Sequence, residues 1–298
     1  MKTQTLLLTG TTGFVGYKFL LYALSNNFNV IDILRSKNKN NKKINKLRKI
    51  YSHNYKNIFF DSNKSLSKKL NSIKVDCFIN FATLYNNNHT HEQISNFINS
   101  NILFPTLIYD AIHKKTKKII NFGSMMQHSK NKNLVSKNFY AATKNSFEMI
   151  SNFYSTINNK TKFYNIKFYE SFGSDDSRKK ILPTITRNYK KNIITKIISK
   201  KLSLNIIHTD DIINSILILI TNNIKSGNYC LRNNNNINIK NLINSLNNNL
   251  NRKIKVKYEN KPVKSIDNAH IKILPKWRPI KDIKKIIIET FNHETNKN

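Results

Sequence analysis

The chain has 298 residues, enough to bury a sizeable core in one large domain with a smaller lobe. Its formal net charge of +35 would ordinarily indicate a nucleic acid or an anionic membrane surface as partner. The lysines, however, spread along the whole chain among abundant Asn and Ile, three residue types with A/T-rich codons, and no recognised nucleic-acid-binding motif occurs. We therefore attribute the charge to base composition and expect no specific nucleic-acid partner.

Membrane, metal and disulfide classes are also disfavoured. The N-terminal apolar run ends at Thr9, too short for a signal sequence, and no run of about 18 apolar residues occurs. We expect a cytoplasmic protein without a membrane partner. Cys77 and Cys230 lie on apolar segments without Cys-x-x-Cys or Cys/His spacing, which argues against a metal site and against a disulfide framework.

In chain order, apolar strand patterns alternate with helical patterns up to about residue 168, the rhythm of a parallel sheet with crossover helices. The predicted strands are 4–9, 28–35, 57–60, 75–81, 117–123 and 162–168, and the predicted helices are 14–25, 41–50, 65–71, 94–113 and 138–157. Beyond about residue 170 the elements shorten, with a strand near 203–208 and helices near 184–191, 210–222, 239–250 and 280–291. This pattern predicts a doubly wound α/β fold.

The first predicted strand runs into a glycine-spaced turn and then into an apolar helix. Gly10 permits the tight turn, Gly13 lets backbone amides approach a pyrophosphate, and Gly16 lets the helix lie close to the strand. The helix N-terminus favours the anion. The motif predicts a dinucleotide site, with contacts from Gly10, Thr12, Gly13, Phe14, Val15 and Gly16.

Tyr140 and Lys144 stand four residues apart, on one face of a predicted helix. A nearby ammonium favours phenolate, so the tyrosine can exchange a proton near neutral pH, as carbonyl reduction requires. By itself, this spacing also fits an ordinary surface pair. Ser124 follows the strand at 117–123 and is the candidate hydroxyl of the same site, although a strand-end serine can simply cap the backbone.

Together these motifs resemble the extended short-chain dehydrogenase/reductase (NAD-dependent epimerase/dehydratase) family, most closely its nucleotide-sugar 4-ketoreductases of the CDP-paratose synthase type. The resemblance implies a Rossmann domain over 1–168 and a mainly substrate-binding α/β lobe over 169–298. It implies that Tyr140 is the general acid, that Ser124 orients the substrate carbonyl, and that Lys144 assists Tyr140 and holds the nicotinamide ribose. Asn101 either completes a proton relay or pins the backbone of its helix.

Cofactor choice depends on the end of the second strand. NAD-preferring relatives place an acid there, but this chain has Leu34 followed by Arg35 and Ser36, which suits the 2′-phosphate of NADP(H) over NAD(H). Asp32 lies too early on the strand to reach the ribose. Asp61 resembles the acid that contacts the adenine amino group, or else it caps its strand, and Ala82 ends the fourth strand beside the cofactor.

The family's dehydratases carry Thr-Asp-Glu where this chain has Ser124 followed by two methionines, which disfavours dehydration. The resemblance therefore implies NADPH-dependent reduction of the 4-keto group of a nucleotide-linked deoxysugar, for polysaccharide precursor synthesis. The alternatives are an NAD-dependent nucleotide-sugar 4-epimerase, a non-catalytic NAD(P)-binding protein and a basic nucleic-acid-binding protein. A homodimer is compatible with all of these. The expected sugar-nucleotide contacts are Glu170, Arg178, Lys180 and His208.

Overall fold

The computed structural model describes residues 3–128, 135–248, 250–263, 271–279 and 282–296. The chain divides into two compact units. The first unit comprises Met1–Lys167, Ile216–Cys230 and Ala269–Pro275, and the second comprises Phe168–Ser215, Leu231–Asn268 and Lys276–Asn298. The sequence places a single boundary after residue 168, whereas the chain returns twice to the first unit after crossing it.

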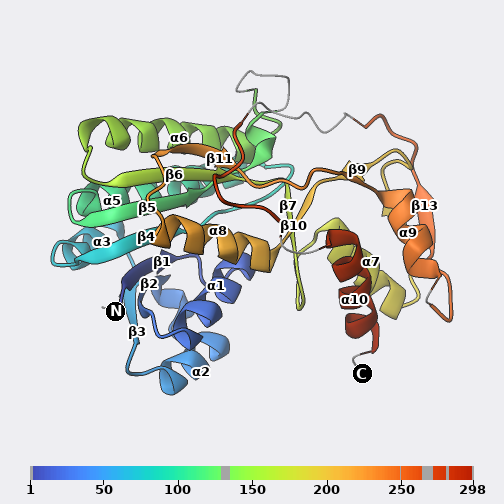
Figure 1. Cartoon of the computed structure of the whole chain (residues 1–298), viewed down its shortest axis with the longest axis horizontal. Coiled ribbons are helices and arrows are strands. Elements are labelled where there is room, and N and C mark those ends of the chain that lie inside the picture. The colour runs from blue at the N-terminus through green and yellow to red at the C-terminus, as the bar shows by residue number, and fades with distance from the viewer. Residues whose placement is uncertain (1–2, 129–134, 249, 264–270, 280–281, 297–298) are drawn as a thin grey trace. The chain divides into compact units, whose positions relative to one another are not determined.

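A seven-stranded parallel sheet forms the centre of the first unit, and the predicted doubly wound α/β fold is confirmed (Figure 1). Its strand order is β11-β6-β5-β4-β1-β2-β3. The strands are β1 (Thr5–Thr9), β2 (Asn29–Arg35), β3 (Tyr55–Phe60), β4 (Val75–Asn80), β5 (Thr116–Phe122), β6 (Lys162–Lys167) and β11 (Gly227–Cys230). The sequence pattern does not predict β11, because its four residues lack an apolar run of their own.

The helices of the first unit begin and end close to the predicted positions. They are α1 (Phe14–Ser25), α2 (Lys42–Ile50), α3 (Asn63–Leu70), α4 (Ile94–Ile98), α5 (Phe104–Ile112) and α6 (Phe139–Ile157). The single helix predicted over 94–113 is interrupted by a π-helical turn at Asn99–Leu103. Pro105 explains the interruption, since it has no N–H to donate to the carbonyl one turn earlier.

Helices α3, α5 and α6 cover one face of this sheet (Figure 1). Strand side chains such as Leu7, Phe78 and Ile119, all fully buried, pack there against Tyr109 of α5 and Phe147 of α6. Because successive strand residues point to opposite faces, Leu6 and Leu8 are buried on the other side. The sheet is therefore buried on both faces, as the apolar strand sequences require.

A row of polar side chains crosses the carboxyl half of the sheet. Thr9 donates to Asn80 at 2.7 Å, Asn80 to Asn121 at 3.0 Å, Asn121 to Asn165 at 3.1 Å, and Asn165 to Asn228 at 2.9 Å. These residues are register partners on five neighbouring strands. The ladder satisfies buried amides and fixes the strand register beneath the candidate site, since a shift by one residue would break every bond.

The second unit is built on three two-stranded pairs. They are β7 (Glu170–Phe172) with β10 (Ile206–His208), β8 (Thr195–Ile197) with β13 (Val256–Tyr258), and β9 (Ser203–Leu204) with β12 (Ile237–Asn238). Its helices are α7 (Ile181–Lys190), α9 (Ile239–Asn247) and α10 (Ile283–Asn296), and α8 (Thr209–Thr221) begins in it. The strand predicted near 203–208 is thus two short strands with different partners.

The Trp277 indole of this unit donates to the Asp211 carbonyl at 2.9 Å. This bond joins the segment at Trp277 to the first turn of α8. Within the described ranges, no helix has the length and apolarity needed to cross a membrane. Cys77 and Cys230 are buried free thiols, and the same ranges contain no cluster of His, Cys, Asp and Glu suited to a metal ion.

Candidate active site

Gly10 and Gly16 shape the turn between β1 and α1. Gly10 has a φ of +73°, and a Cβ there would lie 2.4 Å from the Ala82 backbone nitrogen. A Cβ on Gly16 would lie 2.4 Å from the Gly10 carbonyl oxygen. Both positions therefore require glycine, one for its conformation and both for close backbone approach.

The first turn of α1 fits a pyrophosphate. Gly13 is the N-cap residue, and it brings no side chain to the amides of the turn. These amides and the positive end of the helix dipole suit an anion. Of the other residues predicted to contact the cofactor, Thr12 is exposed, and Phe14 and Val15 are half-buried at the start of the helix. The loop thus has the glycine cradle and the helix end that a dinucleotide needs.

Asp32 lies beneath this loop and is fully buried. Its carboxyl group accepts hydrogen bonds from Thr11 at 2.6 Å and from Tyr55 at 2.8 Å. Burial raises the pKa of the Asp32 carboxyl to about 7, against the opposing effect of these two bonds. Asp32 therefore supports the loop through Thr11, and its carboxyl group is enclosed within the protein.

Arg35 is the last residue of β2, and Ser36 follows it directly. Arg35 is exposed and donates to the Ser100 hydroxyl at 2.9 Å, while the Ser36 hydroxyl oxygen is buried and has no hydrogen-bond partner within the described residues. A guanidinium beside an unsatisfied hydroxyl fits an anionic group at this end of the sheet. Asp61 is exposed directly after β3, and Ala82 is half-buried against Gly10.

Tyr140 and Lys144 lie one turn apart at the start of α6, whose N-cap residue Asn138 accepts from the Ala141 amide at 3.0 Å. Both side chains are buried, with exposed fractions of 8% and 4%. The Tyr140 ring meets the Tyr85 ring edge-on, with centroids 4.9 Å apart. The pair is therefore buried and is not the surface pair that its spacing alone also fits.

Burial lowers the pKa of the Lys144 ammonium to about 8, and the Glu148 carboxylate acts against this shift. Glu148 stands one turn further along α6, so the three side chains lie on one face of the helix. Lys144 is consequently a cation at neutral pH and loses its proton as the pH rises through about 8.

Ser124 follows β5 and is nearly buried, at 6% exposure. Its hydroxyl oxygen accepts from the Met126 amide at 3.2 Å. Ser124 therefore does cap the backbone, which is one of the two roles that the sequence allows for it. This cap does not conflict with a role in binding substrate, because a hydroxyl that accepts one bond still has its hydrogen to donate.

Asn101 lies in the π-helical turn and is fully enclosed, at 1% exposure. Its oxygen accepts from the Leu84 amide at 2.7 Å, and its nitrogen donates to the Leu84 carbonyl at 3.0 Å and to the Thr143 hydroxyl at 2.9 Å. These bonds tie the loop after β4 to α6, next to Lys144. The observed contacts are those of a residue that positions the site.

The four residues predicted to bind the sugar nucleotide all belong to the second unit. Glu170 and Lys180 form an ion pair at 3.2 Å. Arg178 binds Asp176 through two nitrogens, at 2.6 and 2.8 Å, so its charge is already matched. His208 is buried and accepts from the Asp210 amide at 3.2 Å. The structure thus brings Glu170 and Lys180 together, joins Arg178 to Asp176, and joins His208 at the end of β10 to Asp210 in the first turn of α8.

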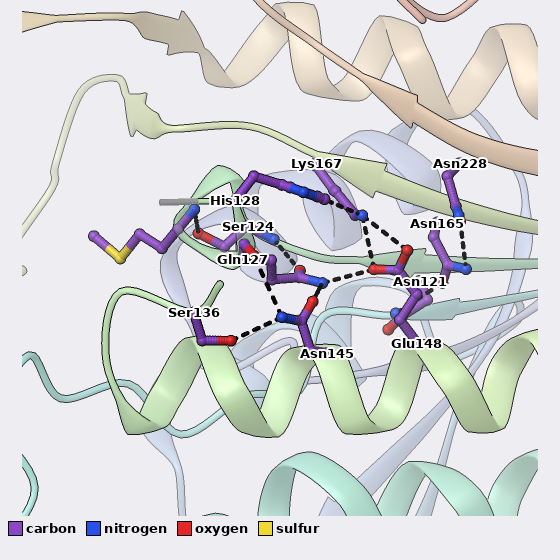
Figure 2. A network of polar contacts seen from close by, with 11 residues as sticks. Asn121, Ser124, Gln127, His128, Ser136, Asn145, Glu148, Asn165, Lys167 and Asn228 are labelled. Carbon is purple, nitrogen blue, oxygen red and sulfur yellow. Dashed lines mark hydrogen bonds and ion pairs between the residues drawn. The ribbon is translucent and has the colours of Figure 1, made fainter. Parts of the chain in front are cut away.

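A buried polar network behind Ser124 is not predicted by the sequence analysis (Figure 2). It contains Gln127, Glu148 and Lys167, with exposed fractions of 0%, 7% and 1%. Glu148 has a local signal, because it continues the one-turn spacing of Tyr140 and Lys144. Lys167 and Gln127 have no such signal, since Lys167 ends β6 and Gln127 ends a short 3-10 turn, and only the folded sheet brings both to α6.

Comparison with known proteins agrees with this geometry. A model of the NAD dependent epimerase/dehydratase family matches residues 6–238. A CDP-abequose synthase of Yersinia pseudotuberculosis is 28% identical over 160 residues, which cover 53% of this chain and 56% of that protein. The chain thus spans little more than half the length of that relative.

Solved structures share the fold. The UDP-glucuronic acid 4-epimerase of Bacillus cereus superposes with a TM-score of 0.80 at 14% identity, covering 97% of this chain and 98% of that one. A UDP-N-acetylglucosamine 4-epimerase of Methanobrevibacter ruminantium gives 0.79 at 18% identity, with 98% of both chains covered. A dTDP-glucose 4,6-dehydratase of Bacillus anthracis, in complex with NAD, gives 0.76 at 17% identity, covering 99% of this chain and 98% of that one.

Proposed function

We propose that this chain, which belongs to the NAD dependent epimerase/dehydratase family, is an NADPH-dependent reductase of the 4-keto group of a nucleotide-linked deoxysugar. The family membership makes it an enzyme of the extended short-chain dehydrogenase/reductase type, with an NAD(P)-binding Rossmann fold. The finer assignment rests on the residues of its site. In this proposal the first unit binds the dinucleotide and the second mainly binds the substrate, in the cytoplasm.

Each side chain of the site has a defined role in this reaction. Bound NADPH supplies the hydride. Tyr140 donates a proton to the carbonyl oxygen, which Ser124 orients by donating its hydroxyl hydrogen. The Lys144 ammonium provides positive charge beside the phenol and binds the ribose hydroxyls of the nicotinamide half. Asn101 fixes the loop at Leu84 relative to α6, so that these groups keep their spacing.

The observation that carries the proposal is the pair of methionines after Ser124. Dehydratases of the family place an acid and a carboxylate there, while Met125 and Met126 offer neither a proton donor nor a base. The Tyr140, Lys144 and Ser124 set therefore serves proton and hydride transfer without elimination of water. Support for a nucleotide-sugar substrate comes from the Yersinia relative, whose name describes synthesis of a CDP-linked sugar.

NADP(H) is the proposed cofactor because of the end of β2. Arg35 offers an exposed guanidinium, and the adjacent Ser36 hydroxyl is buried without a partner in the described part of the chain. A 2′-phosphate would accept from both groups. The ribose hydroxyls of NAD(H) would instead favour an acid at the position of Leu34.

A homodimer is the proposed assembly. Met149, Phe153 and Ile157 of α6 have exposed fractions of 62%, 56% and 53%, at a spacing that aligns them along one helix face. An apolar stripe of this kind is uncommon on a free helix, and a two-fold axis would pack it against its own copy. The stripe lies on the side of α6 that faces away from the core residue Phe147.

The direct test is NADPH oxidation, followed at 340 nm, with 4-keto deoxyhexoses linked to CDP, dTDP and UDP. The wild-type protein should consume NADPH with at least one of them. Tyr140→Phe should lower kcat by about 10²- to 10⁴-fold and leave the NADPH dissociation constant nearly unchanged, because the ring still packs but no proton is delivered. A Tyr140→Phe variant that retains half of the wild-type kcat would exclude Tyr140 as the acid.

A further inference from the structure

Gln127 is held in one orientation by the acceptors around it (Figure 2). Its amide nitrogen donates to Glu148 Oε2 at 2.6 Å and to Asn145 Oδ1 at 2.7 Å. A carboxylate can only accept, and Asn145 turns its nitrogen toward the Ser136 hydroxyl, at 2.7 Å. The amide oxygen of Gln127 must therefore point the other way, where it accepts from the Ser124 backbone N–H at 2.8 Å.

Gly123 makes this contact sterically accessible. A Cβ at Gly123 would lie 2.6 Å from Gln127 Oε1 and 3.0 Å from the Lys167 side chain. A side chain at position 123 would push Gln127 away from the Ser124 amide, and glycine avoids this overlap. Ser124 is held through its amide by Gln127 and through its hydroxyl by Met126.

Glu148 connects this arrangement to the other half of the site. Its carboxylate forms a buried ion pair with Lys167 at 2.8 Å, and Lys167 also contacts His128 Nε2 at 2.9 Å. One turn back on the same face of α6 stands Lys144. The buried Glu148 carboxylate thereby accepts a hydrogen bond from Gln127, which holds Ser124, and also places negative charge one turn from Lys144.

We propose that Gln127 and Glu148 are positioning residues for the reaction: Gln127 fixes the Ser124 backbone, and Glu148 both orients Gln127 and places a negative charge one helical turn from Lys144. The role in catalysis rests on the proposed function, while the contacts themselves do not. Lys167 is the buried cationic partner of the Glu148 carboxylate. Neither Gln127 nor Glu148 touches the reacting atoms in this account.

The electrostatic part involves a small set of charges. Lys144 is faced by Glu148 and Tyr140 on α6, and Glu148 is faced by Lys167 on β6 and by His128 after β5. Burial, together with the Lys167 ammonium, lowers the pKa of His128 to about 4, so His128 is neutral at working pH. Burial lowers the pKa of Lys144 and the Glu148 charge raises it, so removal of the Glu148 charge should lower the Lys144 pKa further.

The Gln127 contact is tested with Gln127→Met, which keeps the side-chain length and removes both hydrogen-bonding groups. kcat should fall about ten- to hundredfold with KM for NADPH within about twofold, since Ser124 loses its alignment while the cofactor loop is untouched. Amide hydrogen exchange in the peptide containing Ser124 should speed up. A variant with a lower melting temperature but unchanged kcat and unchanged exchange would overturn this part.

The Glu148 contact is tested with Glu148→Gln, and Asp110→Asn is the matched control. The control substitution also removes a carboxylate that is hydrogen-bonded to α6, since Asp110 accepts from the Tyr154 hydroxyl at 3.2 Å. Tyr154, however, lies ten residues beyond Lys144 on that helix. Competitive acylation of Lys144 across pH, read by peptide mass spectrometry, should show its midpoint lowered by about one pH unit in Glu148→Gln and unchanged in the control. The alkaline limb of kcat should move by the same amount.

An unchanged Lys144 midpoint in Glu148→Gln would overturn the electrostatic part. If this variant does not fold, Glu148→Gln combined with Lys167→Met removes the unpaired buried ammonium and gives the same measurement. If the wild-type protein reduces none of the sugar nucleotides, the proposed function fails, while the acylation midpoints and the exchange rates still decide whether the two contacts exist.

Discussion

Gly10→Ala perturbs the dinucleotide loop at its most constrained residue. The added Cβ would lie 2.4 Å from the Ala82 nitrogen, 2.5 Å from the Phe81 carbonyl carbon and 2.7 Å from the Ala82 Cα. All three atoms are backbone, so no side chain can move to relieve the overlap. The φ of +73° is also unfavourable for alanine.

The cost can be estimated from these two effects. A left-handed conformation costs an L-residue about 1–2 kcal/mol, and forcing an extra carbon into packed structure adds about 1–3 kcal/mol. We expect the free energy of unfolding to fall by about 2–5 kcal/mol, which for a chain of this size lowers Tm by about 5–15 °C. The displaced loop should also weaken NADPH at least about tenfold, because a lost charge-assisted hydrogen bond is worth about 1.5–3 kcal/mol.

Gly227→Ala is the control for this experiment. Gly227 belongs to the same sheet, but the nearest atoms to its added Cβ are those of the Tyr229 ring at 3.7 Å, an ordinary contact. Thermal melts and NADPH titrations should leave this variant close to wild type and separate it clearly from Gly10→Ala. If both variants had the same Tm and the same NADPH affinity, the constrained loop would not be the cofactor site.

Three further predictions concern cofactor choice, pH and assembly. Arg35→Ala should weaken NADPH by about 1.5–3 kcal/mol in titrations and leave NADH almost unaffected, and equal losses would exclude a contact with the 2′-phosphate. Because burial lowers the pKa of Lys144 from 10.5 to about 8, kcat should decline as the pH rises through about 8. A kcat that stays constant up to pH 10 would refute the role of the ammonium. Between about pH 8 and pH 10.5, Lys144 is protonated in the unfolded chain but not in the folded one, so its contribution to the free energy of unfolding should rise with pH. Phe153→Glu should convert a dimer to a monomer in light scattering without changing NADPH affinity, and a wild-type monomer would refute the proposed assembly.

Local spacing made much of the first unit predictable. The glycine turn at Gly10, the strands that flank it and the helix that begins at Phe14 depend on neighbours in sequence, so periodicity and turn residues were sufficient. The same holds for Tyr140 and Lys144, because one helical turn defines their relation. Their burial was not visible in the sequence, and it is this burial that distinguishes a site from a surface pair.

Long-range contacts account for what the sequence did not show. Strand β11 joins the sheet after the chain has formed part of the second unit, and the sequence Gly227–Cys230 does not indicate that it pairs with β6. The enclosure of the Asp32 carboxyl group by Thr11 and Tyr55 depends on residues more than twenty positions away in the sequence. The orientation of Gln127 depends on acceptors from α6, eighteen or more residues further along the chain. Such contacts exist only once the sheet and helices have assembled.

Deuteride tracing tests the central claim most directly. The wild-type protein is incubated with NADPH deuterated at the transferable nicotinamide position and with the 4-keto deoxyhexose nucleotide that it reduces best, and the sugar product is examined by NMR and mass spectrometry. The account predicts one deuterium at C4 of the product for each NADPH oxidised, with the same label absent in Tyr140→Phe. Interconversion of 4-hydroxy sugar nucleotides without net NADPH consumption, or no transfer of label to C4, would contradict it.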